Sequence, residues 1–423
     1  MGKFAETEVD DGIGETFRYT ENNVVDSLAS EDRLSSLSDD ILRHILSFNP
    51  TKDAVITGVL SKRWIHLWCS IPFLDFTNIK LGNIESILHF NQLVNSVFVS
   101  RDIAGSRSIN SFYLDIEYAN RSHAYFHSFP NLTTFVNLVV KLKVQHLHLL
   151  LNMLNGLVDA DVPPRLPHSI FSCKTLEVLK LSWFRVEGFC VSSVQFGFPS
   201  LKTLHLKRIN FDNYRDMLLL LAGCPILEDF KAFNLFVYND VWEESFCQVI
   251  QRLNLSKLIR AYITDSCYFP LEALFHLEFL KIQLMEMYTP YDFATYHNLT
   301  HLVINNIWDS VLQALHHCPK LQNLELYQKT HSWWDEHIEG QEQESWVDPK
   351  FPPQCLQLSL RTCTIRDFTF SDLQHNIMLA RYILNNAKVL QTMTIWSDKD
   401  QPQIERELSS CPRASATCQL SVY

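Results

Sequence analysis

Histidine and cysteine are the residues of this chain whose chemistry could support catalysis or metal binding. His146 and His148 alternate, and His316 and His317 are adjacent. Zinc sites combine histidines with cysteines or carboxylates, and neither pair has them at ligand spacing. The eleven cysteines include no C-x-x-C pair, so they indicate no zinc framework or redox pair. We interpret the histidines as packing or surface residues and the cysteines as buried free thiols, and we expect no metal and no cofactor.

The sequence also lacks the motifs of common enzymes. It has no G-x-S-x-G, no Walker or dinucleotide-binding glycine pattern and no H-E-x-x-H. Eleven glycines in 423 residues leave few positions for a phosphate-binding loop. We therefore expect a non-catalytic protein.

Composition argues against two further classes of function. The net charge is −11 and no basic stripe occurs, which argues against nucleic-acid binding. The longest apolar runs, such as Met217 to Ala222, are far shorter than the about 20 residues that span a bilayer. We recognise no signal peptide and predict a protein of the nucleus or the cytoplasm, or both.

An apolar triplet of the form L-x-x-L-x-L repeats from about Ile109 onward. Its starts are 19 to 35 residues apart, which is typical of leucine-rich repeats. The clear copies are Val144-Leu147-Leu149, Leu176-Leu179-Leu181, Leu201-Leu204-Leu206, Leu277-Leu280-Ile282, Leu299-Leu302-Ile304 and Leu321-Leu324-Leu326. Weaker copies are Ile109-Phe112-Leu114, Leu227-Phe230-Ala232, Leu258-Ala261-Ile263 and Cys355-Leu358-Leu360. Between them we predict helices at Tyr214–Ala222 and Trp308–His317. An ordinary α/β domain is the alternative, and it fits the recurring triplets less well.

The triplets also predict where a binding surface lies. Each would place a short parallel strand in a solenoid, with its apolar residues pointing inward. The residue between the last two then faces the concave side: Tyr113, His148, Lys180, His205, Lys231, Tyr262, Lys281, Val303 and Glu325. The residues after each strand extend this surface, among them Ser182, Lys207, Phe233, Thr264, Gln283, Asn305 and Tyr327. Four lysines among these favour acidic or phosphorylated partners; the alternative is a solvated face with incidental charges.

The stretch from Asp32 to Phe76 has a different, helical pattern. Asn49-Pro50 separates a first helix beginning near Ser38 from a second beginning near Thr51, and Ser61 can cap a third. The first helix carries an apolar stripe of Leu34, Leu37, Ile41, Leu42, Ile45, Leu46 and Phe48, and the third carries Trp64, Leu67 and Trp68. So small a unit cannot hide this much apolar surface alone. We predict a docking module.

Three other regions complete the chain. Residues 1–31 are acidic with few large apolar residues, which predicts a disordered arm. His331 to Glu344 is polar and acidic, and we predict a loop there. After Ser345 we predict a strand, an amphipathic helix at Asp372–Ala387 and a final strand at Thr392–Ile395. This βαβ-like unit could close the open end of the solenoid.

Two segments resemble known domains of plant proteins. Residues 32–68, DRLSSLSDDILRHILSFNPTKDAVITGVLSKRWIHLW, resemble the plant F-box, with Ser38, Asn49 and Gly58 where proline, leucine and serine are usual. The run LARYILNNAKVLQTMTI, residues 379–395, and ELSSCPRAS, residues 407–415, resemble the FBD domain. The chain is thus similar to the plant F-box/FBD/leucine-rich-repeat family over nearly its whole length after residue 31.

The resemblance implies a substrate-recruiting subunit of a cullin-based SCF ubiquitin ligase. The F-box would bind a Skp-type adaptor, and a cullin-bound RING subunit with its conjugating enzyme would transfer ubiquitin to a protein substrate held by this chain. The residues implied to bind the adaptor are Leu34, Leu37, Ile41, Leu42, Ile45, Leu46, Pro50, Val55, Leu60, Trp64 and Trp68. The concave residues named above, Val303 excepted, would bind the substrate.

Two alternatives remain open from the sequence. The departures at Asn49, where a polar group would replace a buried leucine, and at Gly58 fit a cytosolic leucine-rich scaffold or small-ligand receptor that no longer binds the adaptor. Sequons at Asn120, Asn131, Asn254 and Asn298 fit a secreted ectodomain. Our preferred prediction is an α/β chain: acidic arm 1–31, three-helix F-box 32–76, linking region 77–108, leucine-rich solenoid 109–344 and FBD-type cap 345–423.

Overall fold

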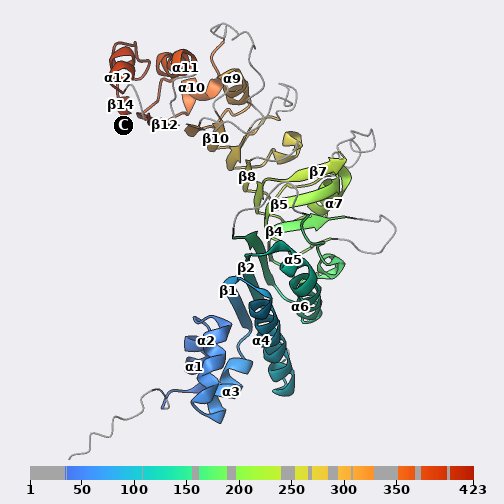
Figure 1. Cartoon of the computed structure of the whole chain (residues 1–423). Coiled ribbons are helices and arrows are strands. Elements are labelled where there is room, and N and C mark those ends of the chain that lie inside the picture. The colour runs from blue at the N-terminus through green and yellow to red at the C-terminus, as the bar shows by residue number, and fades with distance from the viewer. Residues whose placement is uncertain are drawn as a thin grey trace, which may run out of the picture.

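The computed structural model describes residues 34, 36–106, 108–154, 162–187, 197–239, 253–264, 269–283, 294–305, 308–327, 351–366, 373–397 and 401–423. The predicted arm 1–31 and the predicted loop from His331 to Glu344 lie outside these residues. The fold is mixed α/β, with a helical N-terminal region followed by a long parallel sheet (Figure 1). None of the helices in the described ranges combines the length and apolar character needed to cross a membrane.

The N-terminal region contains three short helices, as the sequence predicts. They are α1 (Asp39–Leu46), α2 (Thr51–Ile56) and α3 (Lys62–Cys69), and a 3-10 turn at Thr57–Val59 contains Gly58. Ser38 and Ser61 occupy the N-cap positions of α1 and α3, but neither side chain forms a capping hydrogen bond. The helix starts are therefore confirmed, and the side-chain caps are not.

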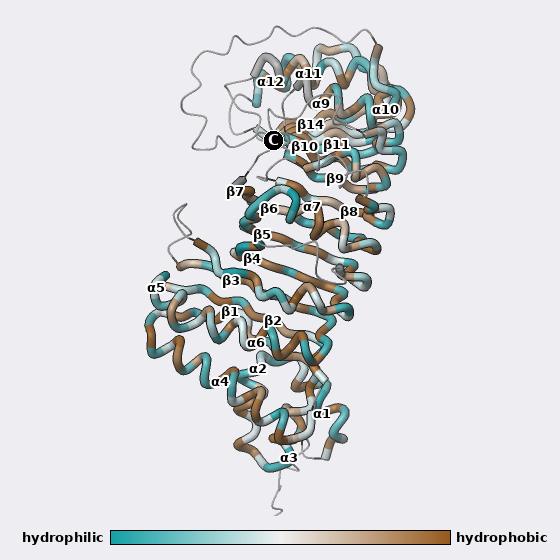
Figure 2. Tube along the Cα trace, turned by 90° about the vertical axis from the view of Figure 1, so that its right-hand side faces the viewer, coloured by the Kyte–Doolittle hydropathy of each residue, from teal (hydrophilic) through white to brown (hydrophobic). Residues whose placement is uncertain are grey.

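The rest of the described chain builds one 14-stranded parallel sheet. Its strands are β1 (Phe73–Leu81), β2 (Ser111–Tyr118), β3 (His146–Met153), β4 (Val178–Val186), β5 (Thr203–Asn213), β6 (Asp229–Phe233), β7 (Phe236–Asn239), β8 (Arg260–Thr264), β9 (Phe279–Ile282), β10 (His301–Asn305), β11 (Asn323–Tyr327), β12 (Thr362–Ile365), β13 (Thr392–Ile395) and β14 (Gln419–Val422). Strand order follows the sequence with one exception. Strand β7 pairs with the C-terminal part of β5, and β6 pairs with the N-terminal part of the same strand. Figure 2 shows the strands following one another along the molecule.

Helices connect many of these strands and lie along one side of the sheet (Figure 1). They are α4 (Ile84–Ile103), α5 (Arg121–His123), α6 (Phe129–Lys141), α7 (Tyr214–Ala222), α9 (Trp308–His316), α10 (Gln354–Leu358), α11 (Leu373–Asn386) and α12 (Gln401–Ser409). A π-helical turn at Ala124–Ser128 and 3-10 turns at His168–Ser172 and Leu271–Leu274 add to them. The predicted helix Tyr214–Ala222 is confirmed, and the predicted Trp308–His317 is one residue shorter.

The apolar triplets form the core between the sheet and these helices. All three residues of each clear triplet are buried, as in Val144, Leu147 and Leu149. Successive strand residues point to opposite faces, so the leucines of a strand face the helices and the residue between them faces away. The triplet pattern thus predicts both the strands and the buried face.

One weak triplet, Cys355-Leu358-Leu360, is wrong. Leu358 is the last residue of α10 and is 66% exposed, and the strand follows at Thr362–Ile365. The buried triplet there is Leu360-Cys363-Ile365. Cys355 and Leu358 belong to α10, and their spacing to Leu360 happens to match that of a strand triplet.

The sheet extends beyond the triplets at both ends. Ile71, Leu74 and Phe76 are buried around β1, before the first predicted triplet at Ile109. At the C-terminal end, β12, α11 and β13 form the predicted βαβ-like unit, and β14 adds a further parallel strand to β13. This unit therefore continues the sheet, and β14 was missed because Gln419–Val422 contains few large apolar residues.

A buried arginine joins the N-terminal helices to the sheet. The guanidinium of Arg101, near the end of α4, donates to the backbone oxygen of Ile71 (2.6 Å) and to that of Ser108 (2.8 Å). Burial lowers the pKa of Arg101 to about 10, so it stays charged at neutral pH. Arg101 thus fixes the segment between α3 and β1 against the loop that precedes β2.

Two glycines let the chain cross itself at close range before β5. A Cβ on Gly197, whose φ is +142°, would lie 3.1 Å from the backbone oxygen of Gly223, and the amide of Phe198 donates to that same oxygen (2.6 Å). We expect Gly197→Ala to lower the free energy of unfolding by about 1–3 kcal/mol, because a side chain is strained at this φ and meets backbone atoms.

Chemical denaturation of the two glycine variants checks this expectation. Gly82→Ala is the matched control, because no atom lies within 4 Å of the added Cβ and its φ is not positive. We expect that control to change stability by less than about 0.5 kcal/mol. Equal stability of the two variants would contradict the close crossing.

Candidate functional site

The N-terminal helices leave two groups of apolar side chains exposed. The first, the α1 stripe, consists of Ile41, Ile45 and Phe48, which recur at helical spacing. The second, the α2–α3 corner, consists of Ile56, Val59, Leu60 and Ile65. Phe48 is 75% exposed and Val59 is 83% exposed. Exposed apolar groups of this size in so small a unit indicate a surface for a partner.

The residues implied to bind an adaptor divide into surface and core. Leu34, Ile41, Ile45, Pro50 and Leu60 are exposed, and Leu37 and Val55 are half-buried. Leu42, Leu46, Trp64 and Trp68 are buried, so they hold the helices together and do not contribute to the exposed surface. The set omitted Phe48, Ile56, Val59 and Ile65, although Phe48 belongs to the same helical stripe as Ile41 and Ile45.

Asn49 does not occupy a buried position. It is exposed, and its side-chain amide donates to the backbone oxygen of Ile45 (3.1 Å). This bond adds to the one that the amide of Phe48 donates to the same oxygen (3.3 Å), at the end of α1 where carbonyl groups lack the usual helical donor. The expected penalty for burying a polar group at Asn49 therefore does not apply in this chain.

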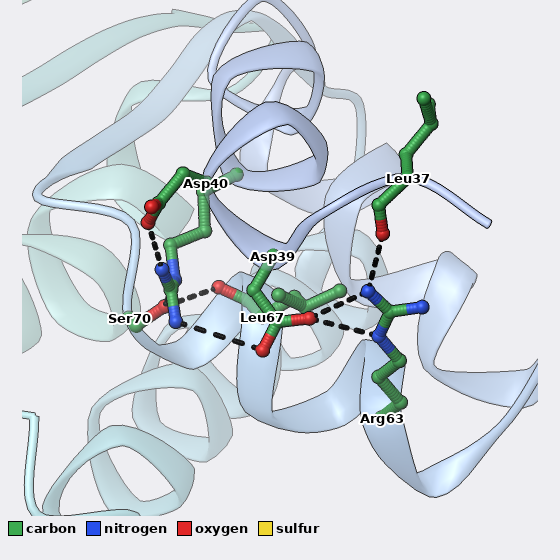
Figure 3. A network of polar contacts seen from close by, with 7 residues as sticks. Leu37, Asp39, Asp40, Arg63, Leu67 and Ser70 are labelled. Carbon is green, nitrogen blue, oxygen red and sulfur yellow. Dashed lines mark hydrogen bonds and ion pairs between the residues drawn. The ribbon is translucent and has the colours of Figure 1, made fainter. Parts of the chain in front are cut away.

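Ion pairs surround the start of α1 (Figure 3). Arg63 of α3 pairs with Asp39 (2.7 Å) and donates to the backbone oxygen of Leu37 (2.6 Å). Arg43 pairs with Asp40 (2.6 Å) and donates to Ser70 (2.9 Å) at the end of α3. Exposed pairs of this kind stabilise a fold by only about 0–1 kcal/mol. Their effect is to hold the entry to α1 against α3.

A second surface lies on the face of the sheet that points away from the triplet leucines. From β2 to β11, with the exception of β7, the strand register places one half-buried residue of each strand in a single line, here called the open-face row: Tyr113, His148, Lys180, His205, Lys231, Tyr262, Lys281, Val303 and Glu325. These include all the residues predicted for the concave face. The register extends the line to Asp75 in β1 and, at the other end, to Thr364, Thr394 and Ser421 in β12, β13 and β14. The sequence interpretation missed these positions.

Aromatic rings organise the side chains of this face. Tyr113 and His148 stack with ring centroids 3.9 Å apart and planes 2° apart. The ammonium group of Lys231 lies 4.6 Å from the ring centroid of Tyr262, and that of Lys281 lies 5.2 Å from the ring centroid of Tyr327. A cation above a ring is attracted by the ring quadrupole and keeps its full charge. The rings therefore position these lysines without neutralising them.

Asp229, at the start of β6, is already bound by neighbouring side chains. One oxygen contacts Nε2 of His205 (2.8 Å) and the other accepts from Arg260 (3.0 Å). Burial alone would raise the pKa of Asp229, but these hydrogen bonds and the charge of Lys231 lower it. Burial lowers the pKa of His205 in spite of this contact, so at neutral pH His205 is uncharged and donates to the carboxylate.

His148 is also neutral. Burial, with a smaller contribution from the nearby Lys180, His146 and His205, lowers its pKa to about 3. Its stacked, half-buried ring is therefore an uncharged packing element, as the sequence interpretation expected. The positive charge of the row at neutral pH comes from its lysines.

Most of the residues predicted to follow each strand lie within or at the end of the strands, and they differ in exposure. Lys207 and Phe233 are exposed, and the ammonium group of Lys207 lies 5.9 Å from the ring centroid of Phe233. Ser182 and Asn305 are buried. The expected extension of the surface is therefore wrong at these two positions; Ser182 lies within β4, where its hydroxyl group donates to the backbone oxygen of Leu151 (3.4 Å).

No group of three or more histidine, cysteine, aspartate or glutamate residues in the described ranges could hold a metal ion. The eight cysteines within those ranges are free thiols, and all but Cys411 are buried. This confirms the interpretation as buried free thiols for the seven buried cysteines and not for Cys411. Cys190, Cys247 and Cys267 lie outside the described residues.

Comparisons with known protein families assign three parts of the chain. Residues 34–76 match the F-box domain, residues 132–238 match the family "FBD-associated F-box protein At5g56370, LRR repeats", and residues 348–395 match the FBD. The chain carries an F-box, a leucine-rich-repeat region and an FBD. The F-box match covers α1 to α3 and ends within β1, and the FBD match covers α10 to β13.

Relatives in Arabidopsis thaliana align with this chain over nearly their full length. The chain is 27% identical to F-box/FBD/LRR-repeat protein At3g26920, over 93% of this chain and 97% of the relative. It is 29% identical to FBD-associated F-box protein At4g10400, over 92% of this chain and 99% of the relative. These plant F-box/FBD/LRR proteins are what the chain is similar to, as the sequence motifs indicate.

Proposed function

We propose that this protein is a substrate-recruiting subunit of a cullin-based SCF ubiquitin ligase. The exposed apolar surface of its F-box, the α1 stripe and the α2–α3 corner, docks onto a Skp-type adaptor, through which the cullin and RING subunits join. The F-box match and that exposed surface carry the proposal. The chain itself is non-catalytic and raises the local concentration of its substrate near the ubiquitin-charged enzyme. It works in the nucleus or the cytoplasm.

The sheet supplies the substrate-binding part of this proposal. Its parallel strands in sequence order, with helices on one side, support a leucine-rich solenoid whose concave side carries the open-face row. The FBD at 345–423 continues the same sheet and closes its C-terminal end. The remaining boundaries are the F-box at 32–76, a linking region at 77–108 and repeats at 109–344.

A pull-down with purified Skp-type adaptor tests the proposed docking surface. The informative variant is Ile45→Asp combined with Val59→Asp, because both side chains are exposed and their replacement leaves the F-box core intact. We expect at least a tenfold loss of adaptor binding, since each substitution places a charge within an apolar interface. Size-exclusion elution and thermal melting should match those of the intact chain.

Val99→Asp is the matched control for this double variant. Val99 is an exposed apolar residue of α4, outside the F-box, and its replacement should leave adaptor binding unchanged. Failure of the intact chain to bind the adaptor, or normal binding by the double variant, would refute the proposed docking.

A further inference from the structure

The lysines of the open-face row recur at a regular interval. Lys180 lies in β4, Lys231 in β6 and Lys281 in β9, and the strands in this part of the sheet follow the order β4-β5-β6-β8-β9. Each pair of successive lysines is therefore separated by one intervening strand. Neighbouring strands lie about 4.7–4.9 Å apart, so the backbone positions of these lysines recur about every 9.5 Å.

These three lysines are not held in ion pairs with carboxylates of the described residues, although the charge of Lys231 acts on Asp229. No ion pair within the described residues involves Lys180, Lys231 or Lys281. Of the acidic side chains nearby, Asp229 is bound by His205 and Arg260, as described above, and Glu325 pairs with Arg366 (2.6 Å). In a chain of net charge −11, this part of the row is a local positive surface that complements an anion.

An extended polypeptide has a matching repeat. In the polyproline II conformation the chain has three residues per turn and rises about 3.1 Å per residue, so every third side chain points to the same side, about 9.3 Å further along. This interval agrees with the spacing of the lysines across the strands. A contiguous run of acidic residues would place only one residue in three on the same side.

We propose that the open-face row binds an extended peptide segment, running across the strands, whose anionic side chains recur at every third residue. This inference rests on the proposed function, because it names the chemistry of the substrate segment that the ligase subunit captures. Carboxylates and phosphorylated serines share that chemistry. The aromatic rings of Tyr262 and Tyr327 hold two of the ammonium groups in place for this contact.

Fluorescence anisotropy with the full chain and labelled peptides tests the inference without requiring the F-box. One 12-residue peptide carries aspartate at every third position, a second carries phosphoserine there, and a third has the composition of the first with its aspartates contiguous. The chain is measured as the wild type and as the triple variant Lys180→Glu, Lys231→Glu, Lys281→Glu. The matched control carries the same charge change at the exposed residues Lys257, Lys320 and Lys388.

We expect the wild type and the control to bind at least one regularly spaced peptide at least tenfold more tightly than the contiguous one. The triple variant should lose this binding at least tenfold while its thermal melting stays unchanged. The aspartate and phosphoserine peptides distinguish the two sources of the anion. Absence of binding by the wild type, equal binding of the contiguous peptide, or unchanged binding by the triple variant would overturn the inference. Adaptor binding is measured separately, so its failure would refute the proposed function and not the peptide site.

Discussion

Leu42→Ala is expected to unfold the F-box and, as a result, to abolish adaptor binding. Leu42 is 0% exposed, whereas its neighbour Ile41 is 49% exposed. Replacing a buried leucine by alanine lowers the free energy of unfolding by about 2–5 kcal/mol. A unit of three short helices has little stability in reserve, so most molecules should lose the packing of α1 on α3.

Hydrogen exchange of the amides in α1 to α3 measures this effect directly. We expect their protection to fall in Leu42→Ala, while the amides of the sheet stay protected. Ile41→Ala is the matched control and should leave protection in the F-box nearly unchanged. Full protection in Leu42→Ala would show that Leu42 is not a core residue.

Arg101→Met is expected to lower the free energy of unfolding by about 2–3 kcal/mol. The substitution removes the hydrogen bonds from the guanidinium to Ile71 and Ser108 and leaves the backbone oxygen of the buried Ile71 without this donor. Arg101→Lys keeps the charge but cannot form the same planar fork, so its loss should be intermediate.

Chemical denaturation of both variants and of Arg361→Met checks the order of these losses. Arg361 is exposed, and its replacement should change stability by less than about 0.5 kcal/mol. If Arg101→Met were as stable as the intact chain, the buried arginine would not hold the F-box against the sheet.

The sequence predicted the open-face row well because the triplets determine its register. Once Leu147 and Leu149 are assigned to the buried face, His148 must point to the other face. Parallel pairing of equivalent positions then brings His148 beside Lys180. The same reasoning could not predict which charged side chains of this face contact one another. Nothing in the pattern shows that Asp229 is bound by His205 and Arg260, since these contacts join three different strands.

The division of the F-box into core and surface could not be read from its helical pattern. The apolar residues of α1 cover more of the helix than is buried in the fold. Leu42 and Ile45 therefore look alike in sequence, although only Leu42 is buried. The role of Arg101 was equally hidden, because its contacts depend on where the segment after α3 meets the loop before β2. The misplaced triplet at Cys355 has a simpler cause, since α10 ends at Leu358, two residues before the buried Leu360, and this is the spacing of a strand.

Because the strands follow one another in sequence order, a strand later in the chain lies further from the F-box. Helix α3 ends at Cys69 and β1 begins at Phe73, so the first strand lies next to the F-box. With a strand spacing of about 4.8 Å, Lys180 lies about 14 Å along the sheet from β1 and Lys281 about 34 Å. Inserting or deleting one repeat upstream would shift every later contact by about one strand spacing. The number of repeats before a contact residue thus sets how far from the F-box a bound segment is held.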